Sequence, residues 1–218
     1  MNDEMMSPRA RLAKSRCTID AGVMGAGCGG AIRRGGEVVA WVSGANVLAE
    51  TFDPRTFGHD SIPRESSGDA TPMVIRSGWV EDGSTPAWLP ASRGLFRERC
   101  DALEARGGEW WIWPRWDHVL SDVPSVQTFF RERSTGTARW GLILDVMGLL
   151  SAEMRGTAAV DHVERIVSAL ATHPSLRGVI MPGDSDTGGE PDPLVDEVRE
   201  RLFRDVTGEV AWIEATGA

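Results

Sequence analysis

Carboxylates close two apolar runs in the C-terminal part of the sequence, and the first chemistry is expected there. Asp145 directly follows the run at residues 142–144, and Glu214 follows the run that ends at Ile213. A short apolar run that ends in an acid is typical of a strand buried on both faces, and ligands bind at the carboxyl ends of such strands. We therefore expect both carboxylates at one face of a parallel sheet. The alternative for Asp145, that it only caps the turn after its strand, stays open.

Other polar side chains follow neighbouring apolar runs. Asp117 and His118 come after the tryptophan-rich run at residues 110–113, and Asp184 begins the acidic part of the loop at residues 182–193. Oxygen-rich loops can hold Mg²⁺ or Ca²⁺, although this one lacks the calcium-loop pattern. Each segment has a plainer alternative: a solvated acidic loop for the second, and the turn before the next helix for Asp117 and His118.

Strands and helices that alternate along the chain would position these residues. Apolar runs at residues 110–113, 142–144, 178–181 and 209–213 are separated by segments with helical spacing. This alternation indicates right-handed βαβ units and a parallel sheet, so the four strands are expected to be parallel and adjacent in chain order.

The four helices carry recognisable start signals and inner faces. Ser92 is expected to cap the first and Gly107 to end it, and Asp192 followed by Pro193 is a strong start for the fourth. Apolar residues at helical spacing predict the inner faces, with Val126, Phe129 and Phe130 in the second helix and Val160, Val163, Ile166, Val167 and Leu170 in the third.

Residues 1–91 are less regular than residues 92–216. Strands are expected at residues 38–42 and 72–75, with a long loop over 53–72 between them. The glycine run at residues 25–30 is similar to a dinucleotide-binding fingerprint. The pair Gly35-Gly36 prevents the helix that would have to follow it, which argues against a nucleotide site.

Composition limits the class of protein. A chain of 218 residues with 41% hydrophobic content predicts one domain over residues 1–218. The net charge of −9 argues against nucleic acid as a partner. Three cysteines without a CxxC pair indicate reduced thiols, and neither a secretory signal nor a membrane-spanning run is found. A cytoplasmic protein without a membrane partner is expected, and its oligomeric state stays open.

Residues 92–216 resemble the C-terminal half of a sugar phosphate isomerase/epimerase of the xylose isomerase-like TIM barrels, which also include endonuclease IV. The segments FRERCDALEARGGEWWIWP, WGLILD and VAWIEAT carry the resemblance. It implies an α/β, TIM-barrel-like parallel sheet with a divalent metal ion (Mn, Mg or Zn) at the carboxyl ends of the strands. In that family a Glu, an Asp, a His and a second Glu bind the metal, and the two glutamates move the substrate proton.

Carried over to this sequence, the resemblance makes Asp145 the aspartate ligand and Glu214 both the last ligand and a catalytic residue. No acid stands near Trp113, where the first glutamate belongs, and no histidine stands near Met181. His118 and Asp184 are then the candidates to complete the metal site.

Three functions follow. The first is metal-dependent isomerisation or epimerisation of a small-molecule carbohydrate. The second is a degenerate, non-catalytic barrel with a binding or structural role, which the two missing ligands favour. The third is an endonuclease IV-like hydrolase, which the acidic balance disfavours. Because a complete barrel takes ~250 residues, the barrel is expected to be incomplete or irregular on the N-terminal side.

Overall fold

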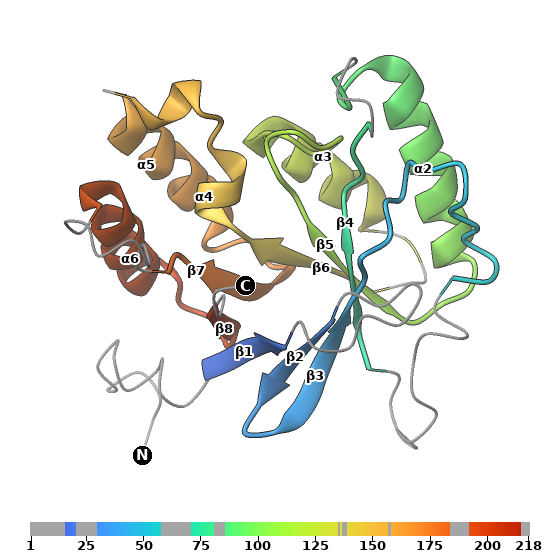
Figure 1. The fold of residues 1–218 in the computed structure, drawn as a ribbon, viewed down its shortest axis with the longest axis horizontal. Coiled ribbons are helices and arrows are strands. Elements are labelled where there is room, and N and C mark those ends of the chain that lie inside the picture. The colour runs from blue at the N-terminus through green and yellow to red at the C-terminus, as the bar shows by residue number, and fades with distance from the viewer. Residues whose placement is uncertain are drawn as a thin grey trace.

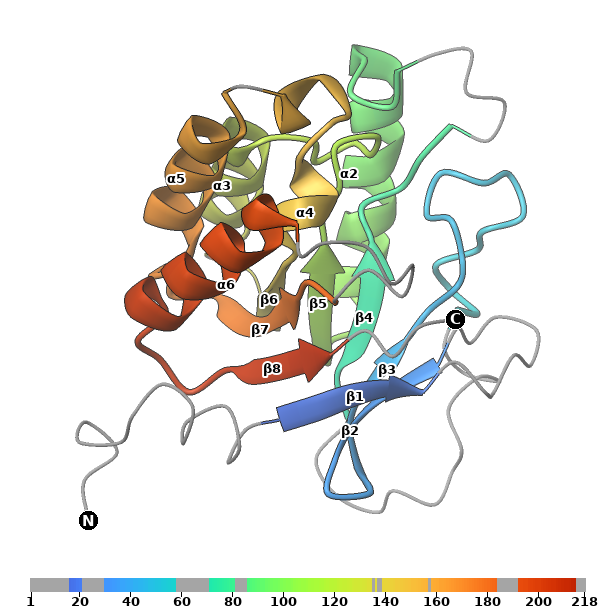
Figure 2. The same ribbon diagram turned by 60° about the vertical axis from the view of Figure 1, so that its left-hand side comes forward.

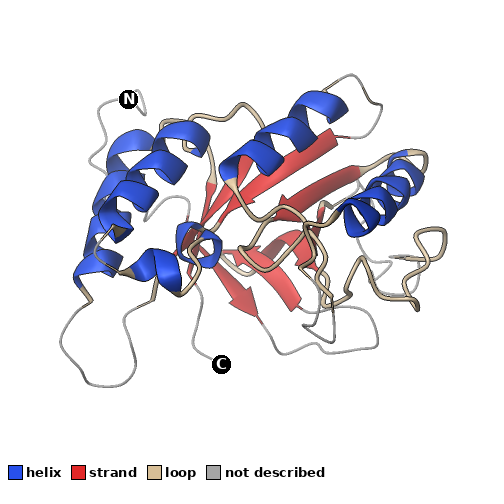
Figure 3. Cartoon of the chain, turned by 90° about the horizontal axis from the view of Figure 1, so that it is seen from above, coloured by secondary structure: helices blue, strands red, loops and turns tan. Residues whose placement is uncertain are grey.

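The computed structural model describes residues 16–20, 30–57, 71–80, 86–134, 136, 139–156, 158–183 and 192–214. They form an α/β fold in which eight strands close into a barrel and helices pack against its outside (Figures 1 and 3). The strands are β1 (Arg16–Asp20), β2 (Gly30–Arg34), β3 (Glu37–Val42), β4 (Met73–Arg76), β5 (Glu109–Trp113), β6 (Arg139–Leu144), β7 (Leu176–Met181) and β8 (Ala211–Glu214). The helices are α2 (Pro90–Glu104), α3 (Val123–Arg133), α4 (Val146–Leu149), α5 (Ala159–Leu170) and α6 (Pro193–Asp205), with a 3₁₀ turn η2 (Glu153–Arg155).

The barrel is mixed rather than fully parallel. Its strands follow one another in chain order, and every pair from β3 to β8 is parallel, as is the closing pair of β8 with β1. The pairs β1–β2 and β2–β3 are antiparallel. The expected parallel order of the four C-terminal strands is confirmed.

Of the two alternatives expected for the N-terminal side of the barrel, incomplete or irregular, the structure shows the second, since the barrel closes but its first strands are antiparallel. Antiparallel neighbours need only a short turn between them, while parallel neighbours need a crossover of a dozen residues or more. Two antiparallel pairs therefore let a chain of 218 residues complete eight strands. The described helices lie over the side formed by β4 to β8 (Figure 2).

Every strand contributes to a barrel interior cluster. Its buried members are Cys17, Ile32, Ala40, Val42, Val74, Trp111, Ile143, Ile180, Ala211 and Ile213. Because side chains alternate along a strand, the neighbours of these residues face outward. Leu142 and Leu144 on β6 accordingly belong to a separate outer cluster between barrel and helices. The apolar runs of the C-terminal strands are buried, as expected of strands covered on both faces, and they include Leu142, Leu144, Val179, Ile180 and Ile213.

Two details of the helices differ from the sequence-based expectations. Helix α2 begins at Pro90 after Leu89, so Ser92 lies in its first turn and does not cap it. Proline suits the first turn because its missing N–H has no acceptor there. Val160 on α5 is 44% exposed, so its place on the inner face was wrong. The start of α6 is as expected, since the Asp192 side chain accepts a hydrogen bond from the Leu194 backbone N–H.

The strand expected at residues 38–42 is confirmed as β3, and it forms a hairpin with β2, a strand that the sequence analysis did not predict. Strands β2 and β3 are joined by Gly35 and Gly36, both with positive φ, a backbone conformation that suits glycine in a two-residue turn. The absence of a helix after the glycine run is thereby confirmed, while residues 25–29 of that run lie outside the described residues. No helix in the described ranges is long and apolar enough to cross a membrane.

A glycine inside the barrel offers a first test of the packing. A Cβ on Gly178 of β7 would lie 2.7 Å from Ile143 Cδ1 and 2.9 Å from Ile213 Cδ1. Gly178→Leu is expected to lower the free energy of unfolding by ~1–3 kcal/mol, the usual cost of overpacking a core. Urea denaturation measures it, with Gly208→Leu as control, since a Cβ there would meet no atom within 4 Å. Equal stability of the two variants would contradict the closed barrel.

Candidate functional site

The ends of β4, β5 and β6 direct three side chains into the mouth of the barrel. Arg76, Trp113 and Asp145 each lie two residues after an interior residue, so they continue the inward-facing rows. We use the name mouth cluster for these three together with the neighbouring side chains that contact or electrostatically affect them, namely Trp79, Arg115, Asp117 and His118.

Asp145 is buried and bound on both of its oxygens. Oδ1 accepts a hydrogen bond from the Gly148 backbone N–H at 2.8 Å, and Oδ2 accepts one from Trp113 Nε1 at 3.1 Å. Burial raises the pKa of Asp145, although the two hydrogen bonds and the positive charge of Arg115 act in the opposite direction. The first bond makes Asp145 the cap of α4, so the capping role left open by the sequence is present.

Arg76 lies against two tryptophan rings. Its guanidinium carbon is 5.8 Å from the centroid of Trp79 and 5.4 Å from that of Trp113, distances typical of cation–π contacts. The backbone of Trp79 is held by Asn46, whose Oδ1 accepts from the Trp79 N–H at 3.1 Å and whose Nδ2 donates to the Trp79 carbonyl at 2.7 Å. Burial lowers the pKa of Arg76, and Arg115 adds to this effect. The guanidinium nevertheless keeps its charge.

Three buried polar atoms near this cluster have no hydrogen-bond partner in the described part of the chain. They are Arg76 Nε, Ser77 Oγ and His118 Nδ1. Buried polar groups in proteins are almost always hydrogen-bonded, so each such atom needs an explanation. Two belong to adjacent residues at the end of β4, and the third belongs to a histidine whose ring stacks on Trp79 at a centroid distance of 5.3 Å. The mouth cluster therefore offers unused hydrogen-bonding capacity.

The histidine is neutral at neutral pH. Burial, together with the positive charges of Arg115 and Arg76, lowers the pKa of His118 to about 4, although the carboxylate of Asp117 acts in the opposite direction. The Nε2 atom lies 3.8 Å from Asp117 Oδ1, while Nδ1 has no partner among the described residues. A neutral imidazole has one donor and one acceptor nitrogen, so His118 can either give or take a hydrogen bond at Nδ1.

Among the described residues, the charges that act on the mouth cluster sum to a positive value, whereas the whole chain is negative. Three arginines, Arg76, Arg115 and Arg155, act on the cluster, against the two carboxylates of Asp117 and Asp145. The formal charges of these five groups sum to plus one. Within the group, Arg115 Nε lies 3.5 Å from Asp117 Oδ1. In a chain with a net charge of −9, this mouth is a place where an anion is favoured.

An exposed tryptophan stands beside the mouth cluster. Trp116 is 44% exposed, and its backbone N–H donates to the Gly148 carbonyl at 2.9 Å, which ties the loop after β5 to α4. Gly148 also binds Asp145, so the position of Trp116 is fixed relative to the buried carboxylate. Large exposed rings of this kind can stack on the apolar face of a sugar.

The structure does not bring the two predicted carboxylates together. Ile213 faces the barrel interior, so the next residue, Glu214, faces outward, where it forms an ion pair with Arg16. Asp145 faces inward because it lies two residues after Ile143. His118 does join Asp145 in the mouth cluster, while Asp184 lies outside the described residues.

The described donors do not fit a divalent metal ion. Within the described ranges, no group of three or more His, Cys, Asp or Glu side chains could hold one. Both oxygens of Asp145 already accept hydrogen bonds, and Glu214 is paired with Arg16. The expected metal, with Asp184 as one of its ligands, stays a prediction that elemental analysis after incubation with Mn²⁺ or Mg²⁺ would test.

Sequence reasoning missed the cationic half of the site. Arg76 directly follows the apolar run at residues 73–75, just as Asp145 directly follows the run at residues 142–144. The pattern that pointed to Asp145, a charged residue at the end of an apolar run, was therefore present for Arg76 too. A strand was expected at residues 72–75, but the arginine that follows it was not considered as a site residue. Arg115, two residues after the end of β5, was passed over in favour of the neighbouring Asp117 and His118.

Comparisons of the chain with protein-family models, with curated proteins and with solved structures find no match. The function is therefore inferred from the mouth cluster, with its buried carboxylate, its guanidinium between two rings and its positive local charge.

The neutral, buried His118 predicts a pH dependence of stability. Its folded-state pKa of about 4 lies below the ordinary value of 6.5, so the unfolded chain takes up the proton first as the pH falls. The stabilisation is present above pH 6.5 and is lost towards pH 4. We expect the free energy of unfolding to fall by ~2 kcal/mol more between pH 7 and pH 4.5 in the unmodified protein than in His118→Gln.

Urea denaturation at the two pH values measures the difference. The raised pKa of Asp145 acts in the opposite sense, but it is common to both proteins. His162→Gln replaces a half-exposed histidine on α5 and serves as the control. Its free energy of unfolding is expected to fall between the two pH values by as much as that of the unmodified protein. An equal fall in the free energy of unfolding for His118→Gln and the unmodified protein would mean that His118 is not buried in its neutral form.

Proposed function

We propose that this chain binds a small anionic carbohydrate, of the sugar phosphate class, at the mouth cluster. The observation that supports this most is the buried Nε of Arg76, which has no acceptor in the described part of the chain although two tryptophan rings fix its guanidinium. A buried donor without a partner costs about 1–3 kcal/mol. An oxygen of a bound ligand would remove that cost.

The two arginines at the mouth suit the anionic group of such a ligand. A guanidinium presents its donors in a planar fork that matches phosphate or carboxylate oxygens, and charge-assisted hydrogen bonds of this kind are stronger than neutral ones. Arg76 would donate from the rim of β4. Arg115, whose contact with Asp117 is 3.5 Å long, is loosely enough paired to turn towards the ligand.

The remaining groups suit a sugar. Asp117 is partly exposed and can accept hydrogen bonds from hydroxyl groups, and His118 Nδ1 can accept or donate one. Trp116 offers an exposed aromatic face beside them. Polar groups in a few fixed directions next to an aromatic surface are the usual composition of a small-molecule site.

Binding without catalysis is the form of this function that the geometry supports best. General acid–base catalysis of isomerisation needs two placed groups, and Glu214, the second predicted carboxylate, faces away from Asp145. Sugar isomerisation is a second candidate because Asp145 is a carboxylate at the mouth of the barrel, and burial raises its pKa, as is common for catalytic carboxylates. In that reaction Asp145 would take the proton from C2 of the sugar and return it to C1, while the proton of the C2 hydroxyl moves to the former carbonyl oxygen at C1, so that the C=O bond shifts from C1 to C2.

Calorimetric titration separates the ligand classes. Ribose 5-phosphate is expected to bind more tightly than either ribose or inorganic phosphate, because only the first engages both the arginines and the hydroxyl-binding groups. The titrations are made with and without EDTA, and equal affinities are expected. Absence of binding by ribose 5-phosphate, or equal affinity for ribose, would contradict the proposal. Incubation with the same compound, followed by assay for the ketose, tests the isomerase candidate, which requires that Asp145→Asn abolish turnover.

A further inference from the structure

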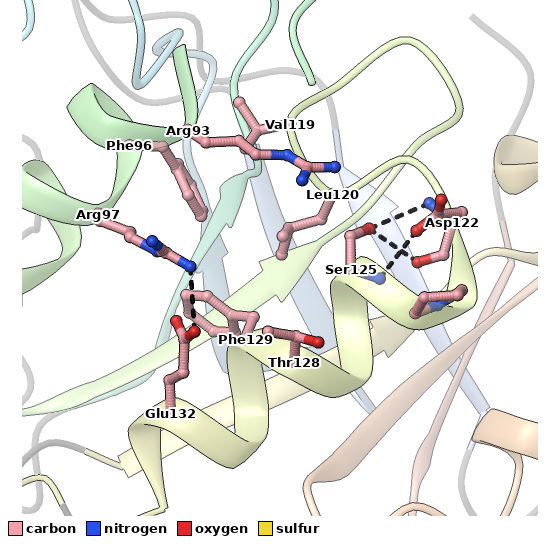
Figure 4. A pocket seen from close by; sticks show the side chains of 11 residues that line it. Arg93, Phe96, Arg97, Val119, Leu120, Asp122, Ser125, Thr128, Phe129 and Glu132 are labelled. Carbon is pink, nitrogen blue, oxygen red and sulfur yellow. Dashed lines mark hydrogen bonds and ion pairs between the residues drawn. The ribbon is translucent and has the colours of Figure 1, made fainter. Parts of the chain in front are cut away.

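A cavity of about 190 Å³ lies outside the barrel, between α2 and α3. Arg93, Phe96 and Arg97 reach it from α2, and Ser125, Thr128, Phe129 and Glu132 reach it from α3 (Figure 4). It is separate from the mouth cluster, since none of the residues that line it belongs to that cluster.

The floor of the cavity is apolar and rigid. Phe96 and Phe129 are buried, with ring centroids 5.8 Å apart, and Leu120 is buried beside them. Apolar cavities of about 150 Å³ in proteins hold a molecule of the size of benzene. The floor therefore suits a single aromatic ring or a short acyl chain.

The rim carries two arginines, Arg93 and Arg97, and two carboxylates, Asp122 and Glu132, so the formal charges of the described lining balance. Arg97 Nη2 is paired with Glu132 Oε1 at 3.0 Å, and Asp122 is engaged as the cap of α3, accepting from the Ser125 N–H at 2.8 Å. Arg93 is exposed and has no ion-pair partner within the described part of the chain. A ligand in this cavity would meet an apolar floor, a free guanidinium and the hydroxyl of Thr128.

We propose that the α2–α3 cavity binds a small monocarboxylate with an apolar body, an aromatic acid or a short-chain fatty acid. The body packs on Phe96 and Phe129, and the carboxylate pairs with Arg93. Each requirement of such a ligand, an apolar surface of the right size and a cation at its rim, is met by a different set of side chains. The proposal is independent of the function proposed for the mouth cluster.

One loop borders both sites. Val119 and Leu120 line the cavity and directly follow His118, and the Val119 N–H donates to the Gly78 carbonyl at 3.0 Å, beside Ser77. A ligand held against Val119 would contact the same segment that carries Arg115 and His118. The cavity and the mouth cluster are therefore connected by consecutive residues of one loop, so that a ligand in the cavity contacts the neighbours of His118.

Titration with benzoate, followed in ¹⁵N–¹H NMR spectra of the full chain, tests the proposal. The amides of Val119 and Thr128 are expected to shift in a saturable manner. Benzamide, which has the same ring without the charge, is expected to bind more weakly. Arg93→Gln should weaken benzoate roughly fivefold, the size expected of an exposed ion pair, and should leave benzamide unchanged.

Two further variants make the test specific. Arg165→Gln removes the same charge from an exposed position on α5 and should leave benzoate affinity as it is. Thr128→Phe places a ring in the cavity and should abolish binding of both probes, while the circular dichroism spectrum shows that the variant is folded. Unchanged benzoate affinity in Arg93→Gln, an equal loss in Arg165→Gln, or binding that survives Thr128→Phe would each overturn the proposal.

Discussion

Leu144→Ala is expected to lower the free energy of unfolding by ~2–5 kcal/mol, the range for a leucine truncated in a well-packed core. Leu144 is fully buried at the end of β6, which lies between β5 and β7. Its side chain belongs to the outer cluster, where the strands meet the inner faces of the helices. Because strands and helices are fixed around it, the structure has little freedom to fill the space that the lost atoms leave.

Urea denaturation followed by far-UV circular dichroism measures this effect. Val160→Ala is the matched control, because Val160 is 44% exposed on α5 and its truncation leaves no cavity. A loss below about 1 kcal/mol for Leu144→Ala would indicate an exposed edge strand, which is incompatible with a closed barrel.

Arg76→Gln is expected to weaken the binding of a sugar phosphate by about 10- to 100-fold. Hydrogen bonds to a charged group contribute about 1.5–3 kcal/mol, and glutamine offers neither the charge nor the Nε donor of arginine. The effect should be specific to the anionic ligand, because the side chains proposed to meet the sugar remain in place. Calorimetric titration with ribose 5-phosphate measures it.

Two variants show whether the geometry of Arg76 matters as well as its charge. Arg76→Lys keeps the charge but loses the planar group that lies against Trp79 and Trp113, so it should recover only part of the affinity. Arg139→Gln removes an exposed charge at the start of β6, the opposite end of the barrel, and should change nothing. Full affinity in Arg76→Gln would exclude Arg76 from the site.

The C-terminal half of the fold could be predicted because its signals are long and periodic. Helix α5 carries Val163, Ile166, Val167 and Leu170 on one face, and Asp192 followed by Pro193 marks the start of α6. Runs such as residues 142–144 are continuously apolar because both faces of the strand are covered, and a continuous apolar run of this length predicts a buried strand. Val160 was misplaced because a helical period specifies a stripe and leaves the width of its buried part to the neighbouring elements.

Of the N-terminal strands, those at residues 38–42 and 72–75 were predicted and are present as β3 and β4, whereas β2 was missed. In β2 the charged Arg33 and Arg34 hide the strand, since an apolar run was the signal sought. The pair Gly35-Gly36 was taken as a break, although two glycines between short strands are also the signature of a hairpin. That hairpin is what allows the barrel to close.

Two of the residues predicted for the site lie in the mouth cluster, and the position of a third has a simple geometric origin. Asp145 and His118 lie in the mouth cluster, whereas Glu214 faces outward. Both carboxylates end an apolar run, but a shift of one residue along a strand moves a side chain to the opposite face. The sequence alone does not say which residue of a strand faces the interior when every residue in it is apolar.

The resonance of the Arg76 Nε–H group in ¹⁵N–¹H NMR spectra tests the central claim most directly. It is assigned by its disappearance in Arg76→Gln and followed during titration with ribose 5-phosphate and with ribose. An acceptor that arrives at the buried, unpartnered Nε should shift this resonance on addition of the phosphate ester, and ribose should leave it in place. A resonance that does not move at saturating ribose 5-phosphate would contradict an anion site at the mouth of the barrel.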